Sequence, residues 1–520
     1  MGYKVYNPYL MAAIATISGF LFGFDISSVS SFVDQPQYKE YFNHPDSLTQ
    51  GGITASMAGG SFLACLICGY VVDKFGRRPI IQVSSLFWLV GCAIQCSARN
   101  VAQLIVGRII SGYGIGFASS TVPVYVSELA PKRIRGRLGG LFQFSLTVGS
   151  TSMFFIGYGC SFIDGPASFR TAWGIMMVPG LLLLLGTFLL SESPRWLAKH
   201  GRWEEAIDII SKVQAGGNVN HPDVVLEIEE MRESIEIENM NAKLTVLDLF
   251  KKDSIRRTFV GISAQVWQQL TGNNVLMYYI VYMFKMAGFS GNTALVSSSI
   301  QYILHCVMTL PTFYILDKWG RRRSLLIGST GMGICLLIMS ILFGIYSTPL
   351  QNIDPSATVR ITVNNKHVSR SVIAVAYIFV AFYSPTWGPG IWLYCSEIFP
   401  TSQRGIASSL CAACNWIFNF ALAMFVPSAF RNITWRTYII FMTFCFTMTI
   451  HVFLMFPETK GRTLEEITMM WDSKVPAWQS AKWEPPVANQ STLEELGDTL
   501  KDDDKKDSVG VHQEYVETKE

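Results

Sequence analysis

Twelve long apolar runs, each roughly twenty residues in length, follow one another along the chain and are separated by polar segments. A helix of about 20 residues crosses the ~30 Å hydrocarbon layer of a membrane. The predicted spans are residues 9–33, 50–72, 79–97, 101–125, 138–160, 170–190, 258–287, 292–317, 323–346, 372–395, 404–429 and 434–456. The first run is too long for a cleaved signal peptide and is interrupted by Gly, Asp and Ser. The pattern therefore predicts an all-α polytopic membrane protein with twelve transmembrane helices.

The composition and the positions of the charges agree with this prediction. Half of the 520 residues are hydrophobic and 15% are charged, whereas a soluble domain carries about 25% charged residues. The connections after spans two, four, eight and ten are basic, which predicts that they and both termini lie in the cytoplasm. Their basic residues are Lys74, Arg77, Arg78, Lys132, Arg133, Arg135, Arg137, Lys318, Arg321, Arg322, Arg323 and Arg404. The eleven cysteines lie mostly inside spans and show no metal-ligand spacing.

Three motifs repeat in the same order, offset by roughly half of the chain. "VVDKFGRRP" returns as "ILDKWGRRR", "SELAPKRIRG" returns as "SEIFPTSQRG", and "ESPR" is echoed by "ETKGR". Such a repeat predicts two six-helix halves around a midplane site, which is the plan of many secondary transporters. The predicted organisation is a first half at 1–190, a cytoplasmic helical linker at 191–257, a second half at 258–467 and a disordered cytoplasmic tail at 468–520.

These repeats, together with "ESPRWL", "QQLTGNNVLMYY" and "PETKGR", resemble the sugar porter family of the major facilitator superfamily. "FGFD" in span one and "IQY" in span eight are similar to fungal hexose and pentose proton symporters. The resemblance covers residues 9 to about 467. It implies a carrier of a glucose- or xylose-type monosaccharide, embedded as a monomer in the lipid bilayer of the plasma membrane. It also implies no enzymatic activity, no cofactor, no metal and no nucleic-acid partner.

Amide side chains and flat aromatic rings suit the hydroxyl rim and the C–H faces of a sugar. Spans seven and eleven place amides deep in the membrane, where they are costly unless they face a hydrophilic cavity. The residues that the resemblance implies for sugar binding, with Tyr278 added from span seven, are Gln143, Gln268, Gln269, Asn274, Tyr278, Trp392, Asn415, Trp416 and Asn419. His305 falls where the family usually has an Asn. We expect it either to bind the sugar or to form a hydrogen bond between helices as a neutral imidazole.

Acidic and basic residues are matched at the predicted cytoplasmic helix ends. Ion pairs that join the two halves would stabilise one closure and separate in the other, as alternating access requires. The predicted gate consists of Asp73, Arg77, Arg78, Glu128, Arg135, Glu192, Arg195, Asp317, Arg321, Arg322, Glu397, Arg404 and Glu458. The preferred pairs are Glu128 with Arg135 and Glu397 with Arg404. The alternative is that the arginines only satisfy the positive-inside rule.

Span ten contains the segment "SPTWGPGIW" at 384–392. Each proline removes a helical hydrogen bond, and glycine tolerates the backbone angles that result. We therefore expect this helix to be broken and able to bend, with Trp392 at its moving end.

Asp25 in span one and Arg108 in span four are charged residues inside otherwise apolar runs. At 1.5 Å per residue both lie roughly 10–12 Å below the outer surface, so we expect them to meet. Because burial and a guanidinium have opposing effects on the protonation of a carboxylate, the pair is predicted to couple proton uptake to sugar transport. The alternatives are a permanent structural ion pair in a proton-independent uniporter, and a glucose sensor that does not transport.

Overall fold

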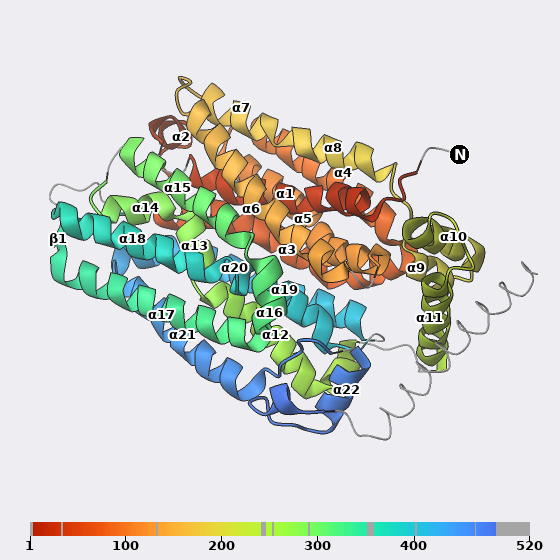
Figure 1. Cartoon of the computed structure of the whole chain (residues 1–520). Helices are drawn as coiled ribbons and strands as arrows, with labels where there is room; N and C mark the ends of the chain where they lie inside the picture. The colour runs from red at the N-terminus through yellow and green to blue at the C-terminus, as the bar shows by residue number, and fades with distance from the viewer. Residues whose placement is uncertain are drawn as a thin grey trace, which may run out of the picture.

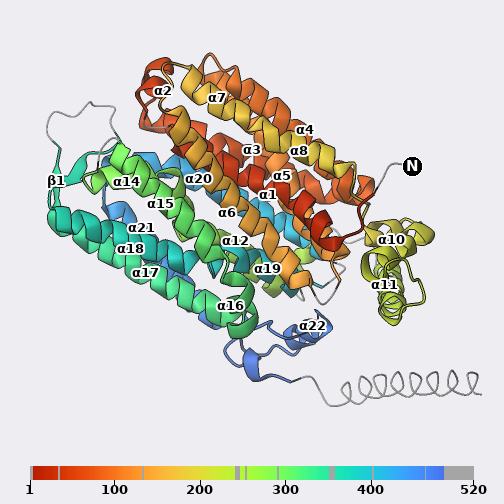
Figure 2. The same cartoon turned by 45° about the horizontal axis from the view of Figure 1, so that its top comes forward.

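The structure is a computed structural model that describes residues 4–32, 35–131, 134–240, 246–251, 254–289, 292–350, 358–400, 403–462 and 464–484. Long helices run side by side in two groups, the N-terminal helices in red to yellow and the C-terminal helices in green to blue (Figure 1). The helices of the linker lie at one end of the bundle, and a short β-hairpin lies at the other end (Figures 1 and 2). We call these the insert end and the hairpin end.

The N-terminal half begins where Asn7 caps the first helix with its side-chain oxygen and Pro8 occupies the first helical turn. Asp46 and Asn100 cap two further helices in the same way. The helices of this half are α1 (Pro8–Ser30), α2 (Pro36–Tyr41), α3 (Ser47–Phe75), α4 (Arg77–Cys96), α5 (Val101–Leu129), α6 (Arg135–Cys160), α7 (Ala167–Ile175) and α8 (Met177–Thr187). The helix α1 is continuous from the insert end to the hairpin end.

The C-terminal half is more interrupted than the N-terminal half. Its helices are α12 (Ile255–Leu270), α13 (Asn273–Tyr278), α14 (Ile280–Met286), α15 (Asn292–Thr309), α16 (Thr312–Trp319), α17 (Arg321–Tyr346), α18 (Lys366–Tyr383), α19 (Trp387–Ile398), α20 (Arg404–Asn432) and α21 (Arg436–Met455). Between α17 and α18 the strands β1 (Ser347–Pro349) and β2 (Ile361–Val363) pair antiparallel, with Ser347 opposite Val363. Ser47 Oγ at the start of α3 lies 3.3 Å from Oγ1 of Thr358, which lies three residues before β2.

The helices coincide with the twelve predicted apolar runs, which confirms the predicted fold class. Among the described residues, nine helical segments are long and apolar enough to cross a membrane. The other three runs correspond to α6, which is rich in Gly, Ser and Thr, to the three consecutive helices α12–α14 and to the pair α15–α16. Polar and small residues lower the hydropathy of these three runs.

Two breaks in the C-terminal half have identifiable causes. Between α12 and α13, Gly272 adopts a φ of +82°, a left-handed conformation that favours glycine. Between α18 and α19, the chain leaves the helix at Ser384–Thr386 around Pro385, which confirms the expected break in span ten. Trp387 Nε1 donates to Leu325 O at 2.9 Å and anchors the start of α19 against α17. The part of span ten that follows this break, α19, is therefore a separate short helix.

The two halves meet along two helix pairs, α3 with α20 and α6 with α15. The α3–α20 contact is close because α3 presents glycines to it. A methyl group at Gly51 would lie 3.1 Å from Met424 O, and one at Gly59 would lie 3.2 Å from the Phe420 ring. Small residues of this kind let helix backbones approach one another in membranes.

The linker forms the helices α9 (Pro194–Lys199), α10 (Trp203–Ala215) and α11 (Pro222–Met240) and the 3₁₀ turn η1 (Val246–Phe250). The helix α10 is amphipathic as expected, since Ala206, Ile209 and Ile210 are buried on one face.

The prediction of a disordered tail from residue 468 is wrong for its first part. The helix α22 (Leu464–Asp472) and the turn η2 (Ser480–Lys482) fold against the insert end of the C-terminal half. Asp472 Oδ1 pairs with Arg257 Nη2 at 2.6 Å, and Trp471 lies against the same guanidinium. Ile467 and Met470 are buried beneath the segment, and this apolar contact holds it in place. Residues 485–520 lie outside the described part of the chain.

Candidate functional site

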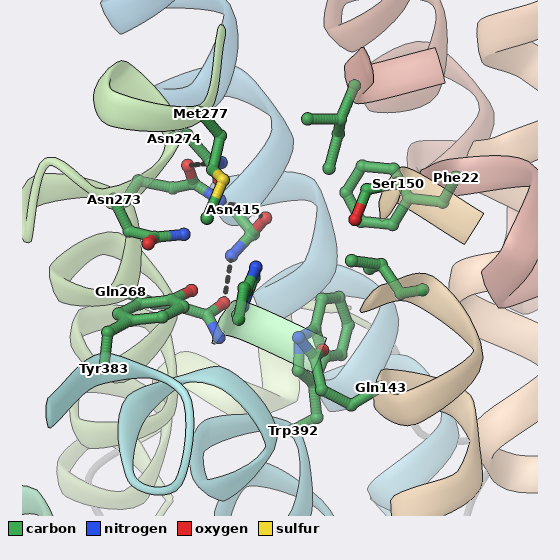
Figure 3. A pocket seen from close by; sticks show the side chains of 14 residues that line it. Phe22, Gln143, Ser150, Gln268, Asn273, Asn274, Met277, Tyr383, Trp392 and Asn415 are labelled. Carbon is green, nitrogen blue, oxygen red and sulfur yellow. Dashed lines mark hydrogen bonds between the residues drawn. The ribbon is translucent and has the colours of Figure 1, made fainter. Parts of the chain in front are cut away.

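A small cavity of about 30 Å³ lies between the two halves. Its lining residues are Phe22, Ile26, Gln143, Leu146, Ser150, Gln268, Gln269, Asn273, Asn274, Met277, His305, Tyr383, Trp392 and Asn415. In Figure 3 Phe22, Gln143 and Ser150 enter from the N-terminal half, and Asn273, Tyr383 and Trp392 face them from the C-terminal half. The structure thus brings Gln143, Gln268, Gln269, Asn274, His305, Trp392 and Asn415 of the predicted set together.

Four amides of the cavity wall, those of Gln268, Gln269, Asn274 and Asn415, form one connected hydrogen-bond network. Gln269 Nε2 donates to Asn415 Oδ1 at 2.8 Å, and Asn415 Nδ2 donates to Gln268 Oε1 at 2.9 Å. Gln268 Nε2 in turn donates to the backbone oxygens of Trp387 and Gly388 at the start of α19. The network therefore fixes the orientation of the amides and ties the wall of the cavity to the broken helix of span ten.

The other three predicted residues lie behind this wall. Asn419 Nδ2 donates to Gln269 Oε1 at 3.3 Å, so it extends the amide network away from the cavity. Trp416 is fully buried, donates to Ser119 Oγ at 3.2 Å and packs on Phe22 with ring centroids 4.8 Å apart. Tyr278 is also buried. Asn419 and Trp416 thus contact residues that line the cavity.

Some polar atoms in the wall have no hydrogen-bond partner among the described residues. Both ring nitrogens of His305 are in this state, although the side chain is 4% exposed. Asn273 Oδ1 is a second such atom. The ring of His305 lies edge-on to Tyr383, with centroids 6.0 Å apart. Buried polar atoms cost free energy unless they are satisfied, so these groups are the ones that a polar ligand in the cavity would engage.

The sequence reasoning missed Phe22, Ile26, Leu146, Ser150, Met277 and Tyr383 as cavity residues. For α6 a signal was present. Gln143, Leu146 and Ser150 are spaced three and four residues apart and therefore share one face of a helix. Phe22 and Ile26 are likewise one turn apart on α1. No comparable signal marks Tyr383, because its position depends on the break that follows it.

Asp25 and Arg108 meet, as the depth count predicts. Arg108 Nη2 lies 2.8 Å from Asp25 Oδ2, and the two side chains are 1% and 0% exposed. Asp25 Oδ1 and two nitrogens of Arg108 have no hydrogen-bond partner among the described residues. The pair lies at the level of the cavity along α1, since Asp25 immediately precedes the cavity residue Ile26, but neither charged residue lines the cavity.

The first charge cluster lies at the insert end of the N-terminal half. Arg77 Nη2 pairs with Glu128 Oε1 at 3.0 Å, and Asp73 lies 3.8 Å from the same guanidinium. Glu192 accepts from the backbone N–H groups of Arg77 and Arg78 at the start of α4. Burial raises the pKa of the Glu192 carboxyl, and hydrogen bonds from these backbone groups act in the opposite direction.

The second charge cluster repeats this arrangement in the C-terminal half. Arg321 makes two contacts with Glu397, at 2.7 and 3.1 Å. Glu458 accepts from the backbone N–H groups of Arg321 and Arg322 at 2.8 and 3.1 Å. Thr459 Oγ1 donates to Glu397 at 2.6 Å. The two clusters therefore have the same plan, in which a loop carboxylate caps a helix and a second carboxylate binds the arginine of that helix.

The pairs preferred from the sequence, Glu128 with Arg135 and Glu397 with Arg404, stay predictions. The observed partner of Glu128 is Arg77 and that of Glu397 is Arg321, and each of these pairs lies within one half. Arg404 begins α20, where its Nη2 donates to Phe399 O at 3.4 Å. Arg195 lies half-buried in α9. Arg135 and Asp317 belong to α6 and α16, and their side chains lie outside the described part of the structure.

Comparisons with known proteins agree with this architecture. Residues 11–471 match the family model described as sugar (and other) transporter. The chain is 53% identical to a high-affinity glucose transporter of Kluyveromyces lactis over 498 residues, which are 95% of this chain and 90% of that protein. It is 49% identical to high-affinity glucose transporter 1 of Candida albicans, over 96% and 93% of the two chains.

Among solved structures, the proton:xylose symporter XylE bound to 6-bromo-6-deoxy-D-glucose superposes with a TM-score of 0.75. The match covers 90% of this chain and all of that chain, at 24% identity. This likeness concerns the fold.

Proposed function

This chain belongs to the family of sugar transporters, and we propose that it carries a monosaccharide by alternating access, in symport with a proton. The observation that carries the proposal is the cavity between the halves, where amides and aromatic rings lie beside the buried Asp25–Arg108 pair. The named glucose transporters among its relatives support a hexose as the substrate, and a pentose such as xylose is the alternative.

In the proposed site the sugar hydroxyls bind the amides of Gln268, Gln269, Asn274 and Asn415, and a C–H face stacks on Trp392. Because the amides already bond to one another, their orientations are fixed before the sugar arrives and little side-chain entropy is lost on binding. The ligands from outside this network are Gln143 and His305. We propose that Tyr278, Trp416 and Asn419 hold the network in place from behind.

The proton site in this proposal is Asp25. A buried ion pair is stable only while both charges are present, since an unpaired charge in low dielectric is costly. Protonation of Asp25 cancels the charge that holds Arg108 and frees the N-terminal half to change its packing around the sugar. Loss of the proton on the other side restores the pair and resets the carrier.

The two charge clusters form the proposed cytoplasmic gate. In the arrangement described here each cluster fastens helices within its own half, so each half moves as a rigid unit when the carrier changes state. The insert end carries these basic residues, which supports a cytoplasmic position for that end, for the linker and for both termini. The plasma membrane is the proposed location, and a monomer is the proposed working unit.

The test is uptake of labelled glucose, galactose, xylose and a disaccharide by cells that lack their own hexose carriers. Cells would express the natural chain, Asp25→Asn, His305→Asn or the control Asp223→Asn, which makes the same change at an exposed linker carboxylate. External pH would be recorded during uptake. We expect external alkalinisation and accumulation of one monosaccharide. Asp25→Asn should lose both while sugar exchange survives, and His305→Asn should change the ratio between sugars several-fold.

The outcomes separate the alternatives. Uptake that only equilibrates, without proton movement and without an effect of Asp25→Asn, would make the protein a uniporter in which Asp25 is structural. Sugar ratios that do not change in His305→Asn would remove His305 from the recognition set. No uptake of any sugar by cells that display the protein at their surface would contradict transport and favour a sensor.

A further inference from the structure

Tyr302 on α15 is fully buried and lies across the boundary between the two halves. Its hydroxyl donates to Met277 O at 2.8 Å and lies 3.0 Å from Ser30 Oγ on α1. The backbone oxygen of Tyr302 accepts from Thr151 Oγ1 on α6 at 3.0 Å. Its ring stacks on Phe154 with centroids 4.6 Å apart. One residue of the C-terminal half thus bonds to two helices of the N-terminal half.

The proton count fixes the direction of these bonds. The phenol has one proton, which is donated to Met277 O, so Ser30 is the donor in the bond between the two hydroxyls. The Ser30 hydroxyl also lies 3.2 Å from Ser27 O one turn earlier on α1, and it shares its proton between this oxygen and the nearer phenol. The result is a chain from Ser30 through the phenol to Met277, that is, from α1 through α15 to α13. Because the bonds are buried, breaking them without access to water would leave polar groups unsatisfied.

These contacts form the wall of the cavity that faces the hairpin end. Ser30 lies four residues after the cavity residue Ile26, and Phe154 lies four residues after the cavity residue Ser150. Both α1 and α6 run from the insert end to the hairpin end, so each contact is one turn nearer to the hairpin end. Met277 itself lines the cavity. The Tyr302 side chain therefore lies between the cavity and the hairpin end.

We propose that Tyr302 is the latch that closes the cavity toward the hairpin end, and so a positioning residue for transport. This inference rests on the proposed alternating access, in which this wall must part for sugar to enter. The hydroxyl bonds to Ser30 only while the halves are together, so the bond favours the closed state by its full net free energy. A sugar that contacts Met277 acts on a residue already bonded to the latch.

The test uses Tyr302→Phe, which keeps the ring and its stack on Phe154 and removes the hydroxyl. Spin labels at Glu40→Cys on α2 and Lys366→Cys at the start of α18 would report the separation of the halves at the hairpin end by double electron–electron resonance. The described native cysteines are buried or half-buried and do not compete with exposed sites. The matched control is Tyr377→Phe, whose hydroxyl donates to Ser297 O at 2.8 Å within one half.

We expect the long-distance, hairpin-open population of purified protein to rise about tenfold relative to the closed one in Tyr302→Phe. Tyr377→Phe should leave the distribution unchanged. Ser30→Ala should shift it in the same direction, and the double variant should add little, because both changes break one bond. A distribution that Tyr302→Phe leaves unchanged, or that Tyr377→Phe changes equally, overturns the latch.

The measurement without sugar keeps this inference separate from the function. If the natural chain shows no uptake but Tyr302→Phe still opens the hairpin end, the latch stands and the proposed function fails. If uptake is normal and the distances do not respond, the latch fails and the proposed function stands.

Discussion

The two halves have the same charge cluster at the insert end and very different membrane interiors. In the N-terminal half the interior holds an ion pair, Asp25 with Arg108, on two helices that are continuous across the membrane. In the C-terminal half the corresponding interior holds neutral amides on helices that are interrupted at Gly272 and Pro385. The buried ion pair and the amide network thus lie in different halves, although both halves line the cavity.

The repeated sequence letters mark repeated geometry. Gly76 and Gly320 have φ values of +95° and +89°, and in both places a methyl group would lie 2.5 Å from a carboxylate oxygen of Glu192 or Glu458. Only glycine permits a carboxylate to approach the helix start so closely. Inside the membrane the sequences of the two halves differ, and one interior holds the ion pair while the other holds the amides.

The largest effect is expected from breaking the Asp25–Arg108 ion pair in the interior of the N-terminal half. Arg108→Met leaves Asp25 buried without its partner and should lower the free energy of unfolding by about 3–5 kcal/mol. Adding Asp25→Asn removes the unpaired charge and should restore much of this loss. Thermal unfolding of the purified protein in detergent checks both variants. Arg323→Met, at an exposed position, is the control and should cost less than about 0.5 kcal/mol. A melting point of Arg108→Met equal to that of the natural chain would contradict the comparison.

The next effect concerns the neutral interior. Gln269→Leu removes the acceptor of Asn274 and Asn419 and the donor to Asn415. Leaving these amides unsatisfied should weaken sugar binding about 10- to 100-fold. Binding of labelled sugar to the purified protein checks this. The control is Gln95→Leu, the same change at a buried glutamine that bonds to Ser111 outside the cavity. Equal losses of affinity in the two variants would remove Gln269 from the proposed site.

The smallest effect is expected when the two charge clusters at the insert end are compared with each other. Glu397 makes two contacts with Arg321 and accepts from Thr459, whereas Glu128 makes one contact with Arg77 and accepts from Ser193. Glu397→Gln should therefore lower the transport rate about tenfold, and Glu128→Gln only a few-fold, because a bidentate charged pair is the stronger one. Initial uptake rates at equal surface expression measure both. The reverse order would show that the number of contacts does not rank the two clusters.

Much of the fold follows from local patterns in the sequence. Apolar runs of membrane length predict the spans, prolines predict the break in span ten, and the repeat predicts the two halves. The break at Gly272 was not predicted, because one glycine in an apolar run does not identify a helix end unless its φ is known. The folded segment of α22 was also missed, since its stability comes from contacts of Trp471 and Asp472 with distant Arg257.

The site residues could be predicted where the residue type itself is unusual at its position in the membrane. Amides at membrane depth identify Gln268, Gln269 and Asn415, and their place in the cavity wall agrees with that reasoning. Apolar lining residues such as Phe22 and Leu146 carry no such mark, because lipid-facing and cavity-facing positions use the same side chains. The partner of Glu128 was equally hidden. Several arginines lie within reach of it in sequence, and only the packing of α4 against α5 selects Arg77.

The stacked rings on the hairpin side of the cavity have an electrical consequence. Phe154 stacks on Tyr302 on the hairpin side of the cavity, and Phe22 packs on Trp416 nearer the insert end, so aromatic carbon borders the cavity at both places. A continuous file of water would conduct protons down their gradient, and each proton that leaked would forfeit about 2.3 kcal/mol per 100 mV of membrane voltage. In the proposed symport, this aromatic packing would block a water file beside the cavity, so that protons would cross only together with the conformational cycle.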